Sequence, residues 1–173
     1  MIITVGRINV PLANLSKIYA DTLLLALAGD QDGLVRDADA KRIYYESTRV
    51  SANNKDFILM VSDSHGTPAL QASHRAPTAM DKDYDSGEGL SGAPVGAVDR
   101  IGDAQISRRV RPETMLVNAL DYYGTWKLFD ALCDAAFYNK NREYALGNTP
   151  QQRFMGRWSD GVPVKELKVT DKP

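Results

Sequence analysis

The sequence predicts an α/β fold in which two buried parallel strands are flanked by helices. Two short apolar runs, residues 22–28 and residues 57–61, contain no charged side chain, which is typical of strands buried on both faces of a parallel sheet. Residues 37–46, between these runs, have the pattern of an amphipathic helix. A long stretch without periodicity follows the second run, and a second, longer helical pattern follows that stretch.

The βαβ unit is predicted from residues 22–61. The first run stops at Gly29, and its short length favours a strand over a helix. The segment from residue 37 to residue 46 begins with acidic residues, which suit the positive end of a helix dipole, and it brings Ala40, Ile43 and Tyr44 to one face. A strand, a helix and a parallel strand in this order form a right-handed crossover.

The remaining elements complete a single predicted domain over residues 1–173, in which residues 1–65 form the βαβ unit. Residues 66–111 are rich in Gly, Pro, Asp and Ser and predict a long loop. Pro112 suits the first position of a helix, so we predict a helix over residues 112–138 and a turn-rich tail over residues 139–173. The aromatic face of that helix is expected to pack in the core, and it comprises Leu116, Leu120, Tyr123, Trp126, Phe129, Cys133 and Phe137.

Composition argues against several classes of partner. The net charge of −1 with interspersed signs provides no basic stripe for nucleic acid. No apolar run approaches the roughly 20 residues that span a bilayer, and the first residues lack the features of a signal peptide, so a cytoplasmic location is the default expectation. Two strands rarely form a stable sheet alone. We therefore expect an N-terminal polypeptide segment, or self-association, to complete the sheet.

The residues with the strongest chemical signal follow the two predicted strands. Asp30 and Asp32, in Gly-Asp-Gln-Asp-Gly-Leu-Val at positions 29–35, come after the first strand, and His65 comes after the second. The carboxyl ends of parallel strands share one edge of a sheet, where ligands of open α/β folds bind. A carboxylate that orients an imidazole is the arrangement of a charge-relay site.

This order of elements resembles the α/β-hydrolase superfamily, in which an apolar strand, a Gly-x-x-Asp-x-x-Val turn, a helix, a strand and a histidine loop follow one another. The resemblance implies that Asp32 is the triad acid and His65 the general base, within hydrogen-bond distance of each other, and that Asp30 is structural. His74, in Ser-His-Arg-Ala-Pro at positions 73–77, is the alternative base. The chain would then be the C-terminal part of a hydrolase sheet. Its C-terminal sequence is similar to that of bacterial members of the superfamily.

The serine nucleophile of that superfamily has no counterpart in this sequence. The motif Gly-x-Ser-x-Gly occurs nowhere, and Ser91, in Gly-Leu-Ser-Gly-Ala, lacks the final glycine and follows the acid and the base. The resemblance therefore implies a serine hydrolase of small-molecule esters or similar acyl bonds whose serine lies outside this chain and which needs no cofactor or metal. We expect the 173-residue chain alone to lack esterase activity.

Two alternatives remain open at this point. The chain is a non-catalytic product of a hydrolase gene, either truncated or used as a scaffold, if no nucleophile ever joins it. Alternatively, Leu-Ala-Gly-Asp-Gln-Asp-Gly at positions 27–33 resembles the first motif of haloacid-dehalogenase-type phosphatases. In that case Asp30 would attack phosphorus, Asp32 would handle the proton, and magnesium would hold the charge.

Overall fold

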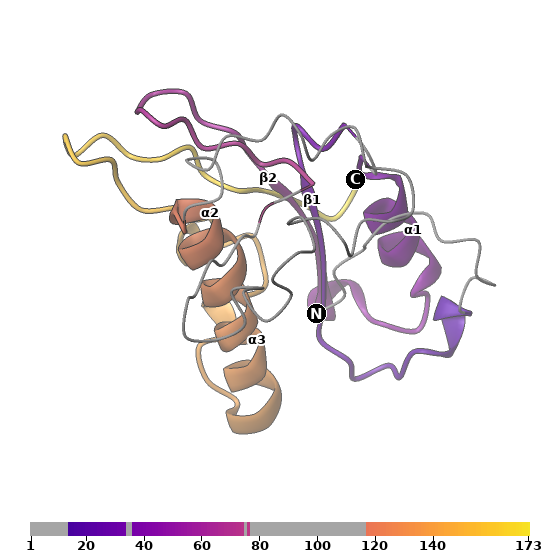
Figure 1. The fold of residues 1–173 in the computed structure, drawn as a ribbon. Helices are drawn as coiled ribbons and strands as arrows, with labels where there is room; N and C mark the ends of the chain where they lie inside the picture. The colour runs from indigo at the N-terminus through magenta and orange to yellow at the C-terminus, as the bar shows by residue number, and fades with distance from the viewer. Residues whose placement is uncertain (1–13, 34–35, 75, 77–116) are drawn as a thin grey trace, which may run out of the picture.

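The computed structural model describes residues 14–33, 36–74, 76 and 117–173, and within them a small mixed sheet is flanked by helices (Figure 1). This is a mixed α/β architecture. In chain order the main elements are β1 (Leu24–Gly29), α1 (Ala38–Glu46), β2 (Lys55–Met60), α2 (Ala119–Asp121), a π-helical turn (Tyr122–Trp126), α3 (Lys127–Tyr138), α4 (Pro150–Arg153) and β3 (Lys168–Thr170). Short 3-10 turns occur at Leu15–Lys17, Ala52–Asn54 and Arg142–Tyr144.

The sheet has the order β1-β2-β3. Strands β1 and β2 are parallel, with Leu24 opposite Lys55 and Gly29 opposite Met60, which confirms the predicted β1–α1–β2 unit. Strand β3 pairs antiparallel with β2 and was not predicted. Its sequence, Lys-Val-Thr, is short and at most half-buried, so it lacks the apolar run by which a buried strand is recognised.

Side chains of β1 and β2 alternate between two apolar layers because successive strand residues point to opposite faces of a sheet. One layer faces α1, and the other faces the helix formed by α2 and α3; Figure 1 shows these helices on opposite sides of the sheet. The α1 layer contains Leu24, Ala26, Phe57, Ala40, Ile43 and Tyr44. The opposite layer contains Leu25, Leu27, Ile58, Met60, Leu120, Leu128 and Leu132.

The long helix begins at Ala119 and not at Pro112, so the predicted start was wrong. Asn118 has extended backbone (φ −146°) and caps the helix, because its side-chain oxygen accepts a hydrogen bond from the Leu120 N–H at 2.8 Å. The Asp121 carboxylate in turn accepts from the Asn118 N–H at 2.8 Å. This reciprocal capping box fixes the first turn. Residues 112–116 lie outside the described part of the chain.

The aromatic face of this helix was also predicted incorrectly. Leu120 is buried, but Trp126, Phe129 and Phe137 are 37%, 45% and 77% exposed. The buried face carries smaller side chains, and a Cβ on Gly124 would lie only 3.0 Å from Met60 Sδ. Close approach to the sheet therefore favours the smaller face, so that Trp126, Phe129 and Phe137 lie on the outside, whereas Tyr123 is partly buried against the core.

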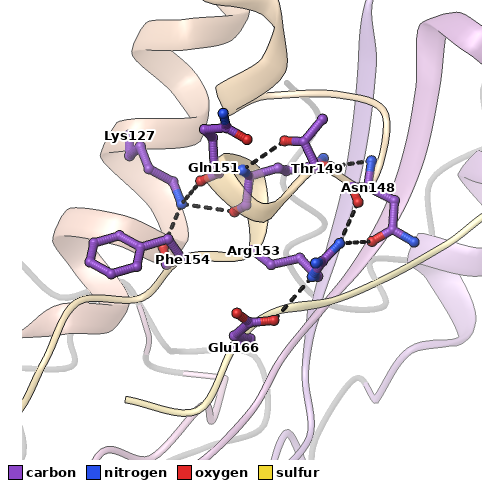
Figure 2. Close-up of polar contacts among 8 residues, drawn as sticks. Lys127, Asn148, Thr149, Gln151, Arg153, Phe154 and Glu166 are labelled. Carbon is purple, nitrogen blue, oxygen red and sulfur yellow. Dashed lines mark hydrogen bonds and ion pairs between the residues drawn. The ribbon is translucent and has the colours of Figure 1, made fainter. Parts of the chain in front are cut away.

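The tail after α3 is held to this helix by hydrogen bonds from the Lys127 side chain to backbone carbonyl oxygens in and just after α4. Lys127 Nζ donates to the carbonyl oxygens of Gln151, Gln152 and Phe154 at 3.1, 2.8 and 2.6 Å (Figure 2). Burial lowers the pKa of the Lys127 ammonium to about 8, although the carbonyl acceptors favour its charged form. Cationic donors at a helix C-terminus satisfy carbonyls that lack helical partners. Lys127 thus fixes the course of the chain that leads to β3.

Candidate active site

The candidate site lies at the carboxyl ends of the parallel strands β1 and β2. After β1, the Asp30 N–H donates to the Met60 carbonyl at 3.0 Å and continues the ladder. The Asp32 N–H then donates to the Gly29 carbonyl at 3.3 Å, which closes a tight turn. Asp32 is therefore fixed by backbone contacts one turn beyond the end of the strand, as the sequence predicted for the acid.

The segment after β2 folds back on itself before it reaches Asp32. Asp63 and Leu70 exchange two backbone hydrogen bonds of 2.9 and 2.8 Å. Two residues later, the Ala72 carbonyl accepts from the Gln31 N–H at 3.0 Å. The loop therefore returns to the end of β1, and the residues that follow Ala72 are the ones that approach the turn carrying Asp32.

Gly29 is required for this approach. A Cβ built on Gly29 would lie 2.1 Å from the Ala72 carbonyl oxygen, far inside van der Waals contact. Since the obstructing atom belongs to the backbone, no rotation of a side chain would relieve the clash. The glycine of the Gly-x-x-Asp turn thus admits the returning loop.

Asp32 contacts His74. Asp32 Oδ2 lies 3.3 Å from His74 Nδ1, and the two side chains are 11% and 27% exposed. An ionised carboxylate only accepts hydrogen bonds, so the donor in this contact is the Nδ1–H of His74, and in the neutral tautomer that makes it Nε2 carries no proton. The predicted pairing of Asp32 with His65 was wrong, because Asp32 contacts His74 and His65 contacts Asp160.

His65 forms a separate pair with Asp160. Its Nε2 lies 2.7 Å from Asp160 Oδ2, and the two side chains are 40% and 54% exposed. The His65 ring also lies beside the indole of Trp158, with 5.8 Å between ring centroids. The hydrogen bond from His65, together with that from the Val162 N–H, lowers the pKa of Asp160.

Asp63 supports the backbone around His65. Its buried carboxylate accepts from the His65 N–H at 3.1 Å, the Trp158 indole N–H at 3.1 Å and the Lys165 N–H at 3.0 Å. Burial raises the pKa of this carboxyl, but the three hydrogen bonds and the charge of Lys165 outweigh burial, and the net effect lowers the pKa. Asp63 was not among the predicted site residues, and its position as an acidic residue shortly after the buried strand β2 was the available signal.

The Asp30 side chain makes structural hydrogen bonds, as the resemblance implied. Its carboxylate accepts from the Ser62 N–H at 3.0 Å and from the Ser62 hydroxyl. These bonds occupy the group that a phosphatase mechanism would need as nucleophile. Within residues 14–33, 36–74, 76 and 117–173, no group of three or more His, Cys, Asp or Glu side chains gathers as a metal site. Ser91 lies outside these residues.

Comparison of the chain with protein-family models, curated proteins and solved structures finds no match. In the described part of the chain, no helix combines the length and the apolar character needed to cross a bilayer.

Proposed function

We propose that Asp32 and His74 are the acid and the general base of a serine-type hydrolase that acts on an ester or similar acyl bond. The nucleophilic serine comes from a polypeptide segment outside this sequence, which also completes the sheet beyond β1. The observation that carries this proposal is the Asp32 Oδ2 to His74 Nδ1 contact, at the carboxyl ends of two parallel strands. Among the described strands, β1 and β3 are the two edges of the sheet. Since β1 belongs to the parallel pair, it is the edge that such a segment would join.

The nitrogen that meets the carboxylate supports this role. In a catalytic triad the acid accepts from Nδ1–H, which orients the ring and leaves Nε2 to take the proton of the nucleophile. The Asp32–His74 contact uses the same nitrogen, Nδ1, which supports this role. The largely buried Asp32 carboxylate would also stabilise the imidazolium that forms, because charges interact more strongly where water is excluded.

The proposed reaction has two halves. The serine oxygen attacks the acyl carbonyl while its proton passes to His74 Nε2, and the tetrahedral intermediate collapses with transfer of that proton to the leaving alcohol. Water then attacks the acyl-enzyme with the same histidine as base. Asp32 remains ionised throughout. The oxyanion donors belong with the serine segment.

His65 is a poorer base for this reaction. Its Nε2, the nitrogen that a triad leaves for the nucleophile, is directed to the Asp160 carboxylate. Both members of that pair are exposed, so water screens their interaction. We therefore assign the His65–Asp160 pair to the joining of two surface turns and not to catalysis.

The first test is the coding region upstream of Met1. An in-frame Gly-x-Ser-x-Gly motif that follows an apolar run is the expected result. Its absence would favour the alternative in which the chain is a non-catalytic product of a hydrolase gene.

The second test uses the longer product that such a region encodes, with p-nitrophenyl acetate as substrate. His74→Ala and Asp32→Asn are expected to lower kcat by on the order of 10³ to 10⁴. His65→Ala is the matched control and should retain activity within about twofold. Loss of activity in His65→Ala with retention in His74→Ala would overturn the assignment.

A further inference from the structure

We propose that the Ser62 hydroxyl, held by Asp30, positions His74 for its role as base. This inference rests on the proposed function and adds two positioning residues to that site. Asp30 lies directly after β1, and Ser62 lies two residues after the end of β2. Their contact therefore joins the ends of the two parallel strands beneath the loop that carries His74.

The hydrogen-bond directions in this cluster are fixed by which groups have protons. The Ala72 N–H can only donate, and it does so to Ser62 Oγ at 2.9 Å. The hydroxyl has one proton of its own, which is directed to Asp30 Oδ1 at 2.5 Å. The Asp30 carboxylate also accepts from the Ser62 backbone N–H at 3.0 Å. Ser62 thus links the Asp30 carboxylate to the Ala72 amide.

Ala72 is held at both of its backbone groups. Its N–H donates to Ser62 Oγ, and its carbonyl accepts from the Gln31 N–H. It is fully buried, with no exposed area. Only Ser73 separates it from His74, so the position of the Ala72 backbone determines where the imidazole begins. The two aspartates of the turn then have separate tasks, since Asp32 contacts the base and Asp30 positions the loop that carries it.

Removal of the Ser62 hydroxyl should change the position of His74, although in this chain of hydrogen bonds Ser62 makes no direct contact with the His74 ring. In Ser62→Ala the Ala72 N–H loses its acceptor inside the protein, and an unsatisfied buried donor is costly. The loop would shift to find another acceptor, and a shift of about 1 Å is enough to impair a catalytic pair. Ser62→Thr is the matched control because it keeps a hydroxyl on the same carbon.

The test reads the ring nitrogens of His74 by 15N NMR in the wild-type chain, Ser62→Ala, Ser62→Thr and Asp30→Asn. The chain has only two histidines, so the spectra contain two ring systems, and His65→Gln assigns them. We expect a single Nδ1–H tautomer for His74 in the wild type and in Ser62→Thr. Ser62→Ala should show a mixture of tautomers and faster exchange of the Gln31 amide. Asp30→Asn, which keeps an oxygen acceptor but no charge, should show an intermediate effect.

The outcomes separate this inference from the proposed function. Wild-type signals of His74 in a folded Ser62→Ala chain would overturn the positioning role and leave Asp32 and His74 as a pair. An Nε2–H tautomer of His74 in the wild type would instead contradict the proposed function. If Ser62→Ala fails to fold, Asp30→Asn decides, and unchanged His74 signals in that variant would overturn the positioning role.

Discussion

The two histidines of this chain both contact a carboxylate, yet the two pairs differ in nitrogen, burial and support. His74 meets Asp32 through Nδ1 in a largely buried setting, and the loop that carries it is fixed by Gly29, Asp30 and Ser62. His65 meets Asp160 through Nε2 at the surface, beside Trp158. A contact between histidine and carboxylate is therefore a weak signature of catalysis. The nitrogen that is used and the surroundings of the pair separate a candidate site from a surface link.

The largest expected effect comes from Gly29→Ala, which would displace the backbone of the loop that carries His74. The new Cβ would meet the Ala72 carbonyl oxygen, so we expect a loss of about 3 kcal/mol or more in the free energy of unfolding. Urea unfolding measures it. Gly33→Ala is the matched control, because a Cβ at Gly33 meets nothing within 4 Å, and it should be close to neutral. Equal stability of the two variants would refute the role given to Gly29.

Gly66→Ala makes the corresponding change in the His65 region. Its Cβ would lie 2.2 Å from the Trp158 ring, which is restrained by the indole hydrogen bond to Asp63. Because the obstructing group is a side chain, we expect a smaller loss of about 1–3 kcal/mol and a changed near-ultraviolet circular dichroism signal from Trp158. The His74 ring signals should be unchanged. A change in those signals would show that the two regions are coupled.

The acid dependence of stability should come partly from Asp63. Its pKa is lowered in the folded chain from the ordinary value of 3.8, so the unfolded chain binds more protons in the window below that value. The contribution of Asp63 is then fully present above about pH 4 and is lost as the pH falls through the folded pKa. The difference in unfolding free energy between wild type and Asp63→Asn should shrink as the pH falls below the ordinary value of 3.8. A difference that is constant over this range would contradict the lowered pKa.

The smallest effect is expected from Asp160→Asn. Because this carboxylate is exposed and paired with an exposed ring, we expect no resolvable change in the urea midpoint and no loss of esterase activity in the longer product. Asp32→Asn, the same change in the other pair, should lower kcat by on the order of 10³ to 10⁴. Comparable losses from both variants would remove the distinction between the pairs.

The sequence was sufficient for the elements that local patterns determine. The structure has β1 and β2 at the two apolar runs, and α1 at the segment with an acidic start and an apolar face. The Gly-x-x-Asp turn lies at the predicted strand end and contains Asp32. In contrast, β3 is a three-residue segment paired with β2, and its only apolar side chain, Val169, is only partly buried against the core. The start of the long helix depends on the Asn118 capping box. The proline at position 112 led to an earlier predicted start.

The choice between His65 and His74 was beyond the sequence. Both follow β2 within a loop, and separation along the chain does not reveal the path of that loop. The Asp63–Leu70 backbone pair folds the intervening residues back, so that residue 72 and not residue 65 reaches the end of β1. The orientation of the long helix also depends on a contact between distant segments. Gly124, in the π-helical turn before α3, allows the smaller face to approach Met60.

The most direct test of the central claim is the protonated nitrogen of each ring in the 173-residue chain. Long-range 1H–15N spectra near pH 9, where unperturbed imidazoles are neutral, distinguish the tautomers. Opposite tautomers are expected, with the proton on Nδ1 of His74 facing Asp32 and on Nε2 of His65 facing Asp160. Asp32→Asn should change only the His74 signals. A proton on Nε2 of His74, or His74 signals that are unchanged in Asp32→Asn, would contradict the assignment of Asp32 and His74 as the catalytic pair.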